Sequence, residues 1–231
     1  MLGRTSCVFV IAAGLCLGAT LPAAAAGGTE LVRALTTVAP TLDRSVLRRA
    51  VAAMNCALDR GLERAERLAI IDFSLPSSEQ RLWIFDLSQR ELLLNELVAH
   101  GQGSGQNVAS RFSNVSGSHQ SSIGLFRTSE SYRGRHGYSL RMDGLEAGIN
   151  DLARERAIVI HGADYVDPQW IDRQGRIGRS QGCPAVRQEV ASTVVDTLKD
   201  GQFLFSWYPD PDWLANSDFL NCPAGALASL D

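Results

Sequence analysis

Short apolar runs bounded by turn residues are the feature that most constrains the fold of this 231-residue chain. Each run is too short for a typical helix and lies next to turn residues, which favours a strand. Two consecutive runs are separated only by Ser88-Gln89-Arg90, so we expect them to form a hairpin. The pattern predicts a mainly β (α+β) fold with a few helices, and strands at residues 69–73, 81–87, 91–99, 157–160 and 203–207.

Helical periodicity is confined to a few segments. Apolar residues recur on one helical face across residues 41–68, where Gly61 is placed to divide the helix in two. Two shorter helices are predicted around residues 145–156 and over residues 188–199. Polar, Gly-containing stretches without an apolar period predict irregular loops, the first of them long enough to be functional, at residues 100–122 and 131–140.

The N-terminus has the features of a cleaved secretory signal peptide over residues 1–26. One positive charge precedes an apolar run from Cys7 to Leu21, and an Ala-rich stretch ends near Ala26. The apolar run is shorter than the ~20 residues of a membrane-spanning helix, so an uncleaved anchor is the weaker alternative. We therefore expect export across the inner membrane to a periplasmic or wall-facing location, with no stable membrane insertion after cleavage.

The charge of the chain argues against nucleic acid as a partner. The sequence has 22 Lys and Arg residues against 25 Asp and Glu residues, a net charge of −3, and loss of Arg4 with the signal peptide lowers it by one. Lys199 is the only lysine, and the arginines are dispersed. Nucleic-acid-binding proteins instead carry basic patches, so we expect no nucleic-acid partner.

Three cysteines follow the signal peptide: Cys56, Cys183 and Cys222. An odd count in an exported protein is typical of one structural pair and one free thiol. A Cys56–Cys222 disulfide would fix the C-terminal tail to the body. The sequence gives no geometry, however, so it leaves open that both are free. Cys183 is the cysteine whose neighbours suggest chemistry.

Cys183 follows a glycine in the segment Ser180-Gln181-Gly182-Cys183-Pro184, and His161-Gly162 ends a predicted buried strand. Nucleophilic catalysis by a thiol needs a base and donors for the developing oxyanion. Cys183 would supply the sulfur, His161 the base, and the backbone amides around Gly182 and Cys183 the donors. A charged His161 and a nearby helix N-terminus would favour the thiolate. The alternative is a buried Cys183 that acts as a small hydrophobic residue.

The motif H-G, followed about twenty residues later by S-x-G-C, resembles the catalytic signature of the L,D-transpeptidase (YkuD-type) family. Further segments extend the resemblance to the branch called the murein L,D-transpeptidase catalytic domain family, over about residues 65–208. The resemblance implies a curved sheet or sandwich preceded by an N-terminal helical segment. The segments that carry it are residues 122–128, 134–140, 153–166 and 178–186.

This resemblance implies peptidoglycan stem peptides as substrates, and no cofactor. Cys183 would attack the carbonyl at the L-centre of the third stem residue of a tetrapeptide, expel the terminal D-Ala and form a thioester. His161 would take the thiol proton, oriented by a backbone carbonyl or by the Ser180 hydroxyl. An amine acceptor would give a 3-3 cross-link, whereas water would make the enzyme an L,D-carboxypeptidase. The sequence does not separate these outcomes.

Two positions depart from the usual S-H-G-C-[IV]-R motif of the broader family. Gln181 replaces the histidine and Ala185 replaces the arginine, so the role of that arginine is unassigned. Nearby candidates are Arg176, Arg179 and Arg187. We expect the residues that bind substrate to be Gly162, His136, Tyr138 and Arg179.

Two other classes of function are alternatives: a zinc peptidase and a non-catalytic wall-binding module. Asp164 and Asp167 follow His161 and, with Cys183, would be the ligands of a zinc site, but no second histidine lies at metal-ligand spacing. A non-catalytic wall-binding module would keep a substrate-binding groove without needing a reactive thiol.

The sequence predicts four parts of the chain: a signal peptide (1–26), a helical segment (27–67), a catalytic domain (68–208) and a C-terminal tail (209–231).

Overall fold

The computed structural model describes residues 23–222 of the chain. Most of the predicted signal peptide (1–26) and the last part of the predicted tail (223–231) lie outside the described residues. Among the described helices, none is both long enough and apolar enough to cross a membrane.

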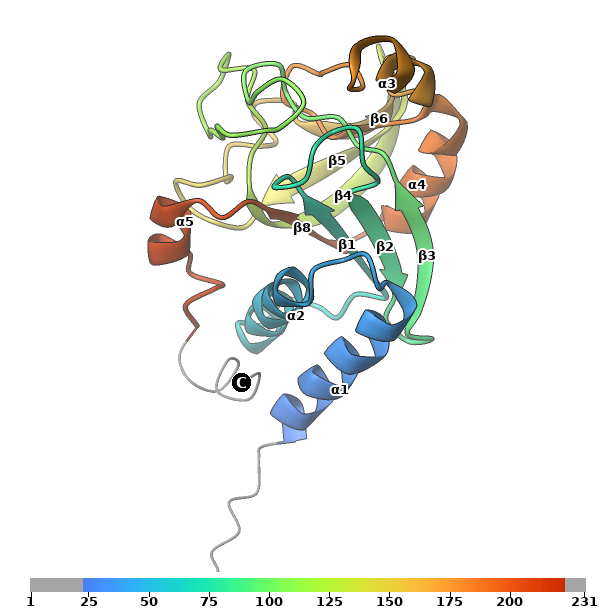
Figure 1. Cartoon of the computed structure of the whole chain (residues 1–231). Coiled ribbons are helices and arrows are strands. Elements are labelled where there is room, and N and C mark those ends of the chain that lie inside the picture. Colours follow the sequence, from blue (N-terminus) through green and yellow to red (C-terminus); the bar gives the residue numbers. More distant parts are fainter. Residues whose placement is uncertain (1–22, 223–231) are drawn as a thin grey trace, which may run out of the picture.

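A single eight-stranded sheet forms the body of the protein, in the order β3-β2-β1-β8-β4-β5-β6-β7 (Figure 1). Neighbouring strands are antiparallel except for β1 with β8 and β6 with β7, which are parallel. The strands are β1 (Arg67–Asp72), β2 (Leu82–Asp86), β3 (Glu91–Glu96), β4 (Gly124–Gly134), β5 (Gly137–Gly144), β6 (Val159–Gly162), β7 (Ala185–Val186) and β8 (Phe203–Trp207).

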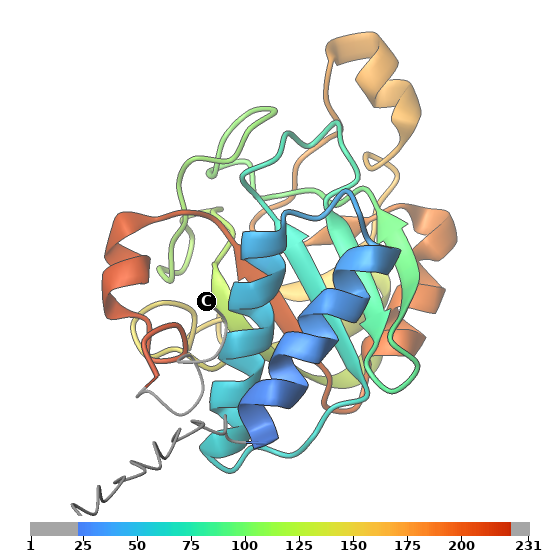
Figure 2. The same cartoon turned by 60° about the horizontal axis from the view of Figure 1, so that its bottom comes forward.

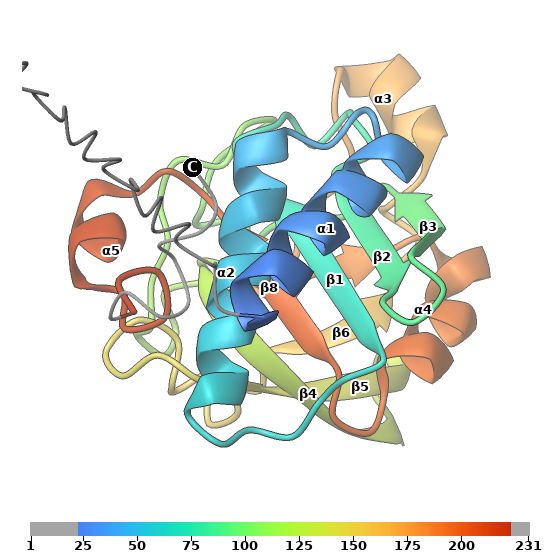
Figure 3. The ribbon, with the colours of Figure 1, turned by 90° about the horizontal axis from the view of Figure 1, so that it is seen from below.

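Side chains that alternate along the strands divide the core in two. Leu68 and Ile70 of β1 pack in a cluster with residues of α1 and α2, and these two helices lie side by side over that face of the sheet (Figures 2 and 3). Ala69 and Ile71 point the other way, into a cluster with α4. The helices are α1 (Ala23–Val38), α2 (Arg44–Asp59), α3 (Pro168–Gln174), α4 (Ala191–Leu198, after a 3-10 turn at Gln188–Val190) and α5 (Pro211–Asn216).

The chain that follows β3 brings the two ends of the sheet together. The N–H of Ala99 donates a hydrogen bond of 2.8 Å to the carbonyl of Ala185 in β7, and Gly101 forms a bridge with Ser180. The sheet is therefore curved almost into a barrel. This architecture confirms the predicted mainly β fold with a few helices.

Two predicted elements are wrong, and one predicted helix is shorter than expected. The helix predicted over 41–68 ends at Asp59, because Gly61 has a φ of +92° and the chain turns into β1. The helix predicted around 145–156 is a series of turns, since Gly148 has a φ of +75° and Asn150 Oδ1 accepts the N–H of Glu146. Such side-chain bonds compete with helical ones. The loop predicted over 131–140 is the β4–β5 hairpin.

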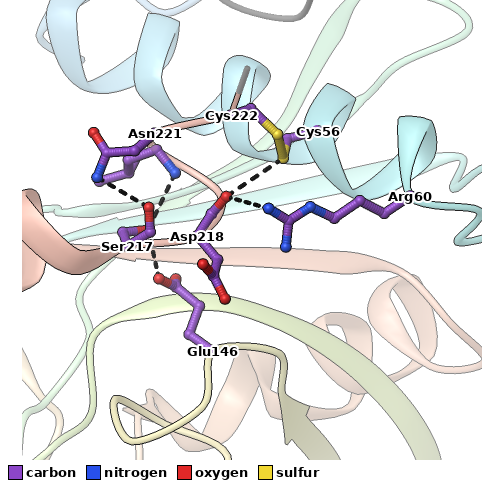
Figure 4. The surroundings of a disulfide bond; sticks show 8 residues. Cys56, Arg60, Glu146, Ser217, Asp218, Asn221 and Cys222 are labelled. Carbon is purple, nitrogen blue, oxygen red and sulfur yellow. Dashed lines mark hydrogen bonds between the residues drawn. A yellow bond between two sulfur atoms is a disulfide. The ribbon is translucent and has the colours of Figure 1, made fainter.

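A disulfide joins Cys56 of α2 to Cys222, one of the two alternatives that the sequence left open (Figure 4). The segment before Cys222 is also packed on the body. Arg60 donates a hydrogen bond of 2.7 Å to the carbonyl of Asp218, and the indole of Trp213 in α5 donates to the buried carboxylate of Glu146 over 2.9 Å. The described part of the predicted tail is thus joined to α2 by the disulfide and to the turn after β5 by the hydrogen bond to Glu146.

Candidate active site

Strand pairing brings the predicted nucleophile and base together. β6 and β7 are parallel neighbours in which His161 lies opposite Ala185, and Cys183 precedes Ala185 by two residues. Both Cys183 and His161 therefore face one cavity of about 250 Å³. The residues that line it are Gln102, Arg135, His136, His161, Tyr165, Arg179, Ser180, Gln181 and Cys183.

The ring of His161 is fixed by its own strand and by a second histidine. Its Nδ1 lies 2.8 Å from the carbonyl of Gly162, and because a carbonyl can only accept, Nδ1 carries the proton and Nε2 keeps a lone pair. His136 stacks on the ring, with centroids 4.5 Å apart. Burial lowers the pKa of His161, and the nearby His136 lowers it further. The imidazole is thus prepared to accept a proton at neutral pH.

The sulfur of Cys183 lies against the backbone of the segment that enters β6. The N–H of Val159 donates to Sγ over 3.5 Å, and Sγ lies 3.7 Å from the carbonyl of Ala157. Burial raises the pKa of the Cys183 thiol, although the Val159 amide and the charge of Arg156 oppose that rise. Burial thus opposes the thiolate that a charged His161 was expected to favour.

Ser180 holds the loop of the nucleophile. Its Oγ donates to the carbonyl of Cys183 over 2.6 Å and accepts the N–H of Gly182 over 3.0 Å. Of the two orienting groups proposed for His161, the structure thus uses the backbone carbonyl. The Gly182 amide is engaged, which corrects its expected role as an oxyanion donor. The amide of Cys183, beside its own sulfur, is the expected donor that remains.

Gly182 is required by its conformation. Its φ is +123°, and a Cβ built there would lie 2.9 Å from the carbonyl oxygen of Gln120 and 2.9 Å from the side chain of Ile158. Only glycine fits this position without displacing the loop.

Two of the predicted substrate-binding residues do not line the cavity. The hydroxyl of Tyr138 donates to Asp196 over 2.8 Å, in the layer that contains α4. Gly162 packs closely against the turn before α4, where an added Cβ would lie 2.6 Å from Gln188 Oε1. Gly162 contributes through its carbonyl, which orients His161. The other two predicted residues, His136 and Arg179, line the cavity.

The sequence of residues 38–207 matches the L,D-transpeptidase catalytic domain family. The chain belongs to this family. The match covers most of the chain and confirms the resemblance that the sequence motifs indicated. No curated protein sequence matches the chain.

Solved structures of L,D-transpeptidases resemble this one weakly. The enzyme from Mycobacterium smegmatis is 14% identical, with 62% of this chain and 59% of that chain covered and a TM-score of 0.39. The enzyme from Stackebrandtia nassauensis is 11% identical, with 78% and 77% covered and a TM-score of 0.38. L,D-transpeptidase 1 of Mycobacterium tuberculosis is 12% identical, with 62% and 62% covered and a TM-score of 0.34. The chain spans about three-fifths of the length of the first of these.

In this member of the L,D-transpeptidase family, Ala185 replaces the arginine of the usual motif. The three arginines that could take over its role lie in different surroundings. Arg187 forms a bidentate ion pair with the buried Glu96: its Nη2 donates to Oε1 over 2.6 Å and its Nε donates to Oε2 over 2.9 Å. Arg176 donates to the carbonyl of Ile177. Arg179 donates to the carbonyl of Gly105 over 2.8 Å and lines the cavity. Arg179 is thus the one of the three that reaches the site.

The donor set does not fit a zinc site. Within residues 23–222, no three His, Cys, Asp or Glu side chains are grouped so that they could hold a metal ion. The carboxylate of Asp167 instead caps α3 by accepting the N–H of Gln169. His161 and Cys183 therefore lack the additional ligands that zinc requires.

Arg156 is a site residue that the sequence did not single out. Its guanidinium donates to the carbonyl of Gln120 over 2.7 Å and to the hydroxyl of Ser122 over 2.5 Å, so it holds the long loop that runs beside Gly182. Its charge also lowers the pKa of Cys183. These partners lie more than thirty residues away in sequence, so no local signal could have identified them.

Proposed function

We propose that this protein is a peptidoglycan L,D-transpeptidase that acts through a Cys183 thioester on tetrapeptide stems, after export to the periplasm or the wall-facing surface. One observation carries the proposal: the only free cysteine among the described residues shares a cavity with a histidine whose Nε2 can accept a proton. The family assignment supports peptidoglycan stem peptides as the substrate class.

The raised pKa of Cys183 and the lowered pKa of His161 favour a neutral thiol and a neutral imidazole in the resting site. Proton transfer to His161 Nε2 therefore accompanies the attack of sulfur on the carbonyl at the L-centre of the third stem residue. The amide of Cys183 donates to the tetrahedral oxyanion. As the C–N bond breaks, His161 returns the proton to the departing D-Ala amine, and a thioester remains.

The acceptor decides the overall reaction. The amine of a second stem attacks the thioester and gives a 3-3 cross-link, with His161 removing the amine proton and returning it to the sulfur. Water in place of the amine releases a tripeptide, and the protein is then an L,D-carboxypeptidase. Both outcomes use the same Cys183 and His161.

The test is incubation of the protein with purified tetrapeptide muropeptides and identification of the products by mass. Cross-linked dimers support the transpeptidase, whereas tripeptides and free D-Ala alone support the hydrolase. Cys183→Ala should abolish both products, and a Cys56→Ser/Cys222→Ser double variant, in which Cys183 is the one described cysteine left, should retain them.

An acyl adduct on Cys183 should be visible by intact mass when the acceptor is omitted. Inhibition by a chelator would point to zinc instead. Binding of muropeptides with no product and no adduct in the wild-type protein would leave only a wall-binding module.

A further inference from the structure

The charged side chains that line the cavity are cationic. Arg135 and Arg179 lie on its wall together with His136 and His161, and the lining contains no Asp or Glu. The cavity thus presents positive charge close to Cys183 and favours an anionic group in whatever it binds.

Arg135 differs from the other arginines of its hairpin. Arg133 lies over the ring of Tyr138, with 5.2 Å to its centroid, and Arg141 pairs with Glu130 over 3.0 Å. The guanidinium of Arg135 makes no hydrogen bond, ion pair or ring contact with any residue of the described range 23–222. Its five donors are free for a ligand.

The backbone next to Arg135 is held against the catalytic base. Its neighbour His136 stacks on His161, and Arg135 and His136 form the turn between Gly134 and Gly137, the last pair of the β4–β5 ladder. The tip of the hairpin is therefore fixed beside the imidazole. The backbone that carries Arg135 is thus held at the cavity, while its guanidinium has no partner among the described residues and can reach a ligand there.

We propose that Arg135 binds a carboxylate of the donor peptide next to the scissile carbonyl and so selects donors with a free acid there. This inference rests on the proposed function. In the proposed reaction, the residue that leaves in the first step carries a C-terminal carboxylate one residue beyond the carbonyl that Cys183 attacks. A guanidinium binds a carboxylate through two parallel hydrogen bonds, and the fixed charge of Arg179 adds to the attraction.

The experiment measures peptide binding by calorimetry in a Cys183→Ala background, where no turnover occurs. Three synthetic tetrapeptides are compared: the free acid, the C-terminal amide, and a peptide amidated on the side-chain carboxyl of the third residue. Arg135→Gln should weaken binding of the free acid by about tenfold or more and leave binding of the C-terminal amide within about twofold. Arg133→Gln, on the same hairpin, is the matched control and should change neither.

Each outcome decides the proposal. If only side-chain amidation abolishes the effect of Arg135→Gln, a carboxylate is still the ligand, but it comes from the third residue. Equal loss for all three peptides, no loss for any, or no binding of the free acid overturns the proposal. A wild-type protein that shows Arg135-dependent binding but forms no product overturns the proposed reaction alone.

Discussion

The guanidinium of Arg81 lies 2.7 Å from Nδ1 of His100, and both side chains are fully buried. The other donors of Arg81 reach the carbonyls of Val98 and Leu75. Because an arginine can only donate, His100 is neutral and carries its proton on Nε2. The carbonyl of His100 in turn accepts the N–H of Ser180 over 3.0 Å. The buried Arg81 and His100 therefore help to hold the loop 180–184 that carries Cys183.

His100 makes the folded protein sensitive to acid. Burial, with the charge of Arg81 beside the ring, lowers the pKa of His100 from 6.5 to about 3. Below pH 6.5 the unfolded chain therefore binds a proton that the folded protein excludes, and stability falls by up to about 1.4 kcal/mol per pH unit until about pH 3. Above pH 6.5 the ring is neutral in both states and adds no pH dependence.

We predict that His100→Gln removes this component. Urea unfolding at pH 7 and pH 5 should show that the wild-type protein loses about 2 kcal/mol more than His100→Gln over the same interval. His119→Gln, which changes an exposed histidine of the same loop region, is the control and should keep the wild-type loss. An identical loss in wild type and His100→Gln would contradict the assignment.

We expect Gly182→Ala to disable the site. A Cβ at this position meets the Gln120 carbonyl at 2.9 Å in a positive-φ conformation, so the loop that carries Cys183 must shift. Stability should fall by about 1–3 kcal/mol, and product formation by about a hundredfold. Gly148→Ala, where φ is also positive but the space is open, should cost about 1–2 kcal/mol and preserve activity. Full activity of Gly182→Ala would contradict the requirement for glycine at this position.

The pH dependence of Cys183 alkylation should report the charge of Arg156. Because Arg156 lowers the pKa of the thiol, Arg156→Gln should move the midpoint of iodoacetamide alkylation to higher pH and slow the reaction at pH 8. Arg156→Lys should restore part of the shift. Arg154→Gln removes a surface ion pair with Glu130 and should leave the midpoint unchanged. A midpoint that stays or falls in Arg156→Gln would refute the electrostatic role.

Apolar patterning predicted the central strands because β1, β2 and β8 are buried on both faces and read as continuous apolar runs. The β4–β5 hairpin was missed for the opposite reason. Its strands become half-buried and polar toward the tip, as the exposed Arg133 and Gly137 show, so no apolar period marks them. Hydrogen bonding to the neighbouring strands, rather than local sequence, makes this segment a hairpin.

The motifs identified Cys183 and His161, and the structure brings these two to one cavity. The roles of Ser180 and Arg156 could not be read from sequence, because each depends on which backbone carbonyls come within reach after folding. The catalytic assignment itself stays a prediction for the muropeptide experiment. The domain boundaries at residues 67 and 208 also stay predictions.

The Cys56–Cys222 disulfide is predicted to stabilise the fold without shaping the cavity. It links residues 166 positions apart, and loss of a cross-link over so long a loop should cost about 2–5 kcal/mol. Its neighbours, among them Arg60 and Asp218, do not line the cavity (Figure 4). Reductant should lower the unfolding free energy of the wild-type protein to that of Cys56→Ser/Cys222→Ser and leave the double variant unchanged. Alkylation of Cys183 at 25 °C should stay within about twofold in both, and a tenfold change in its rate would instead place the C-terminal segment in control of the nucleophile loop.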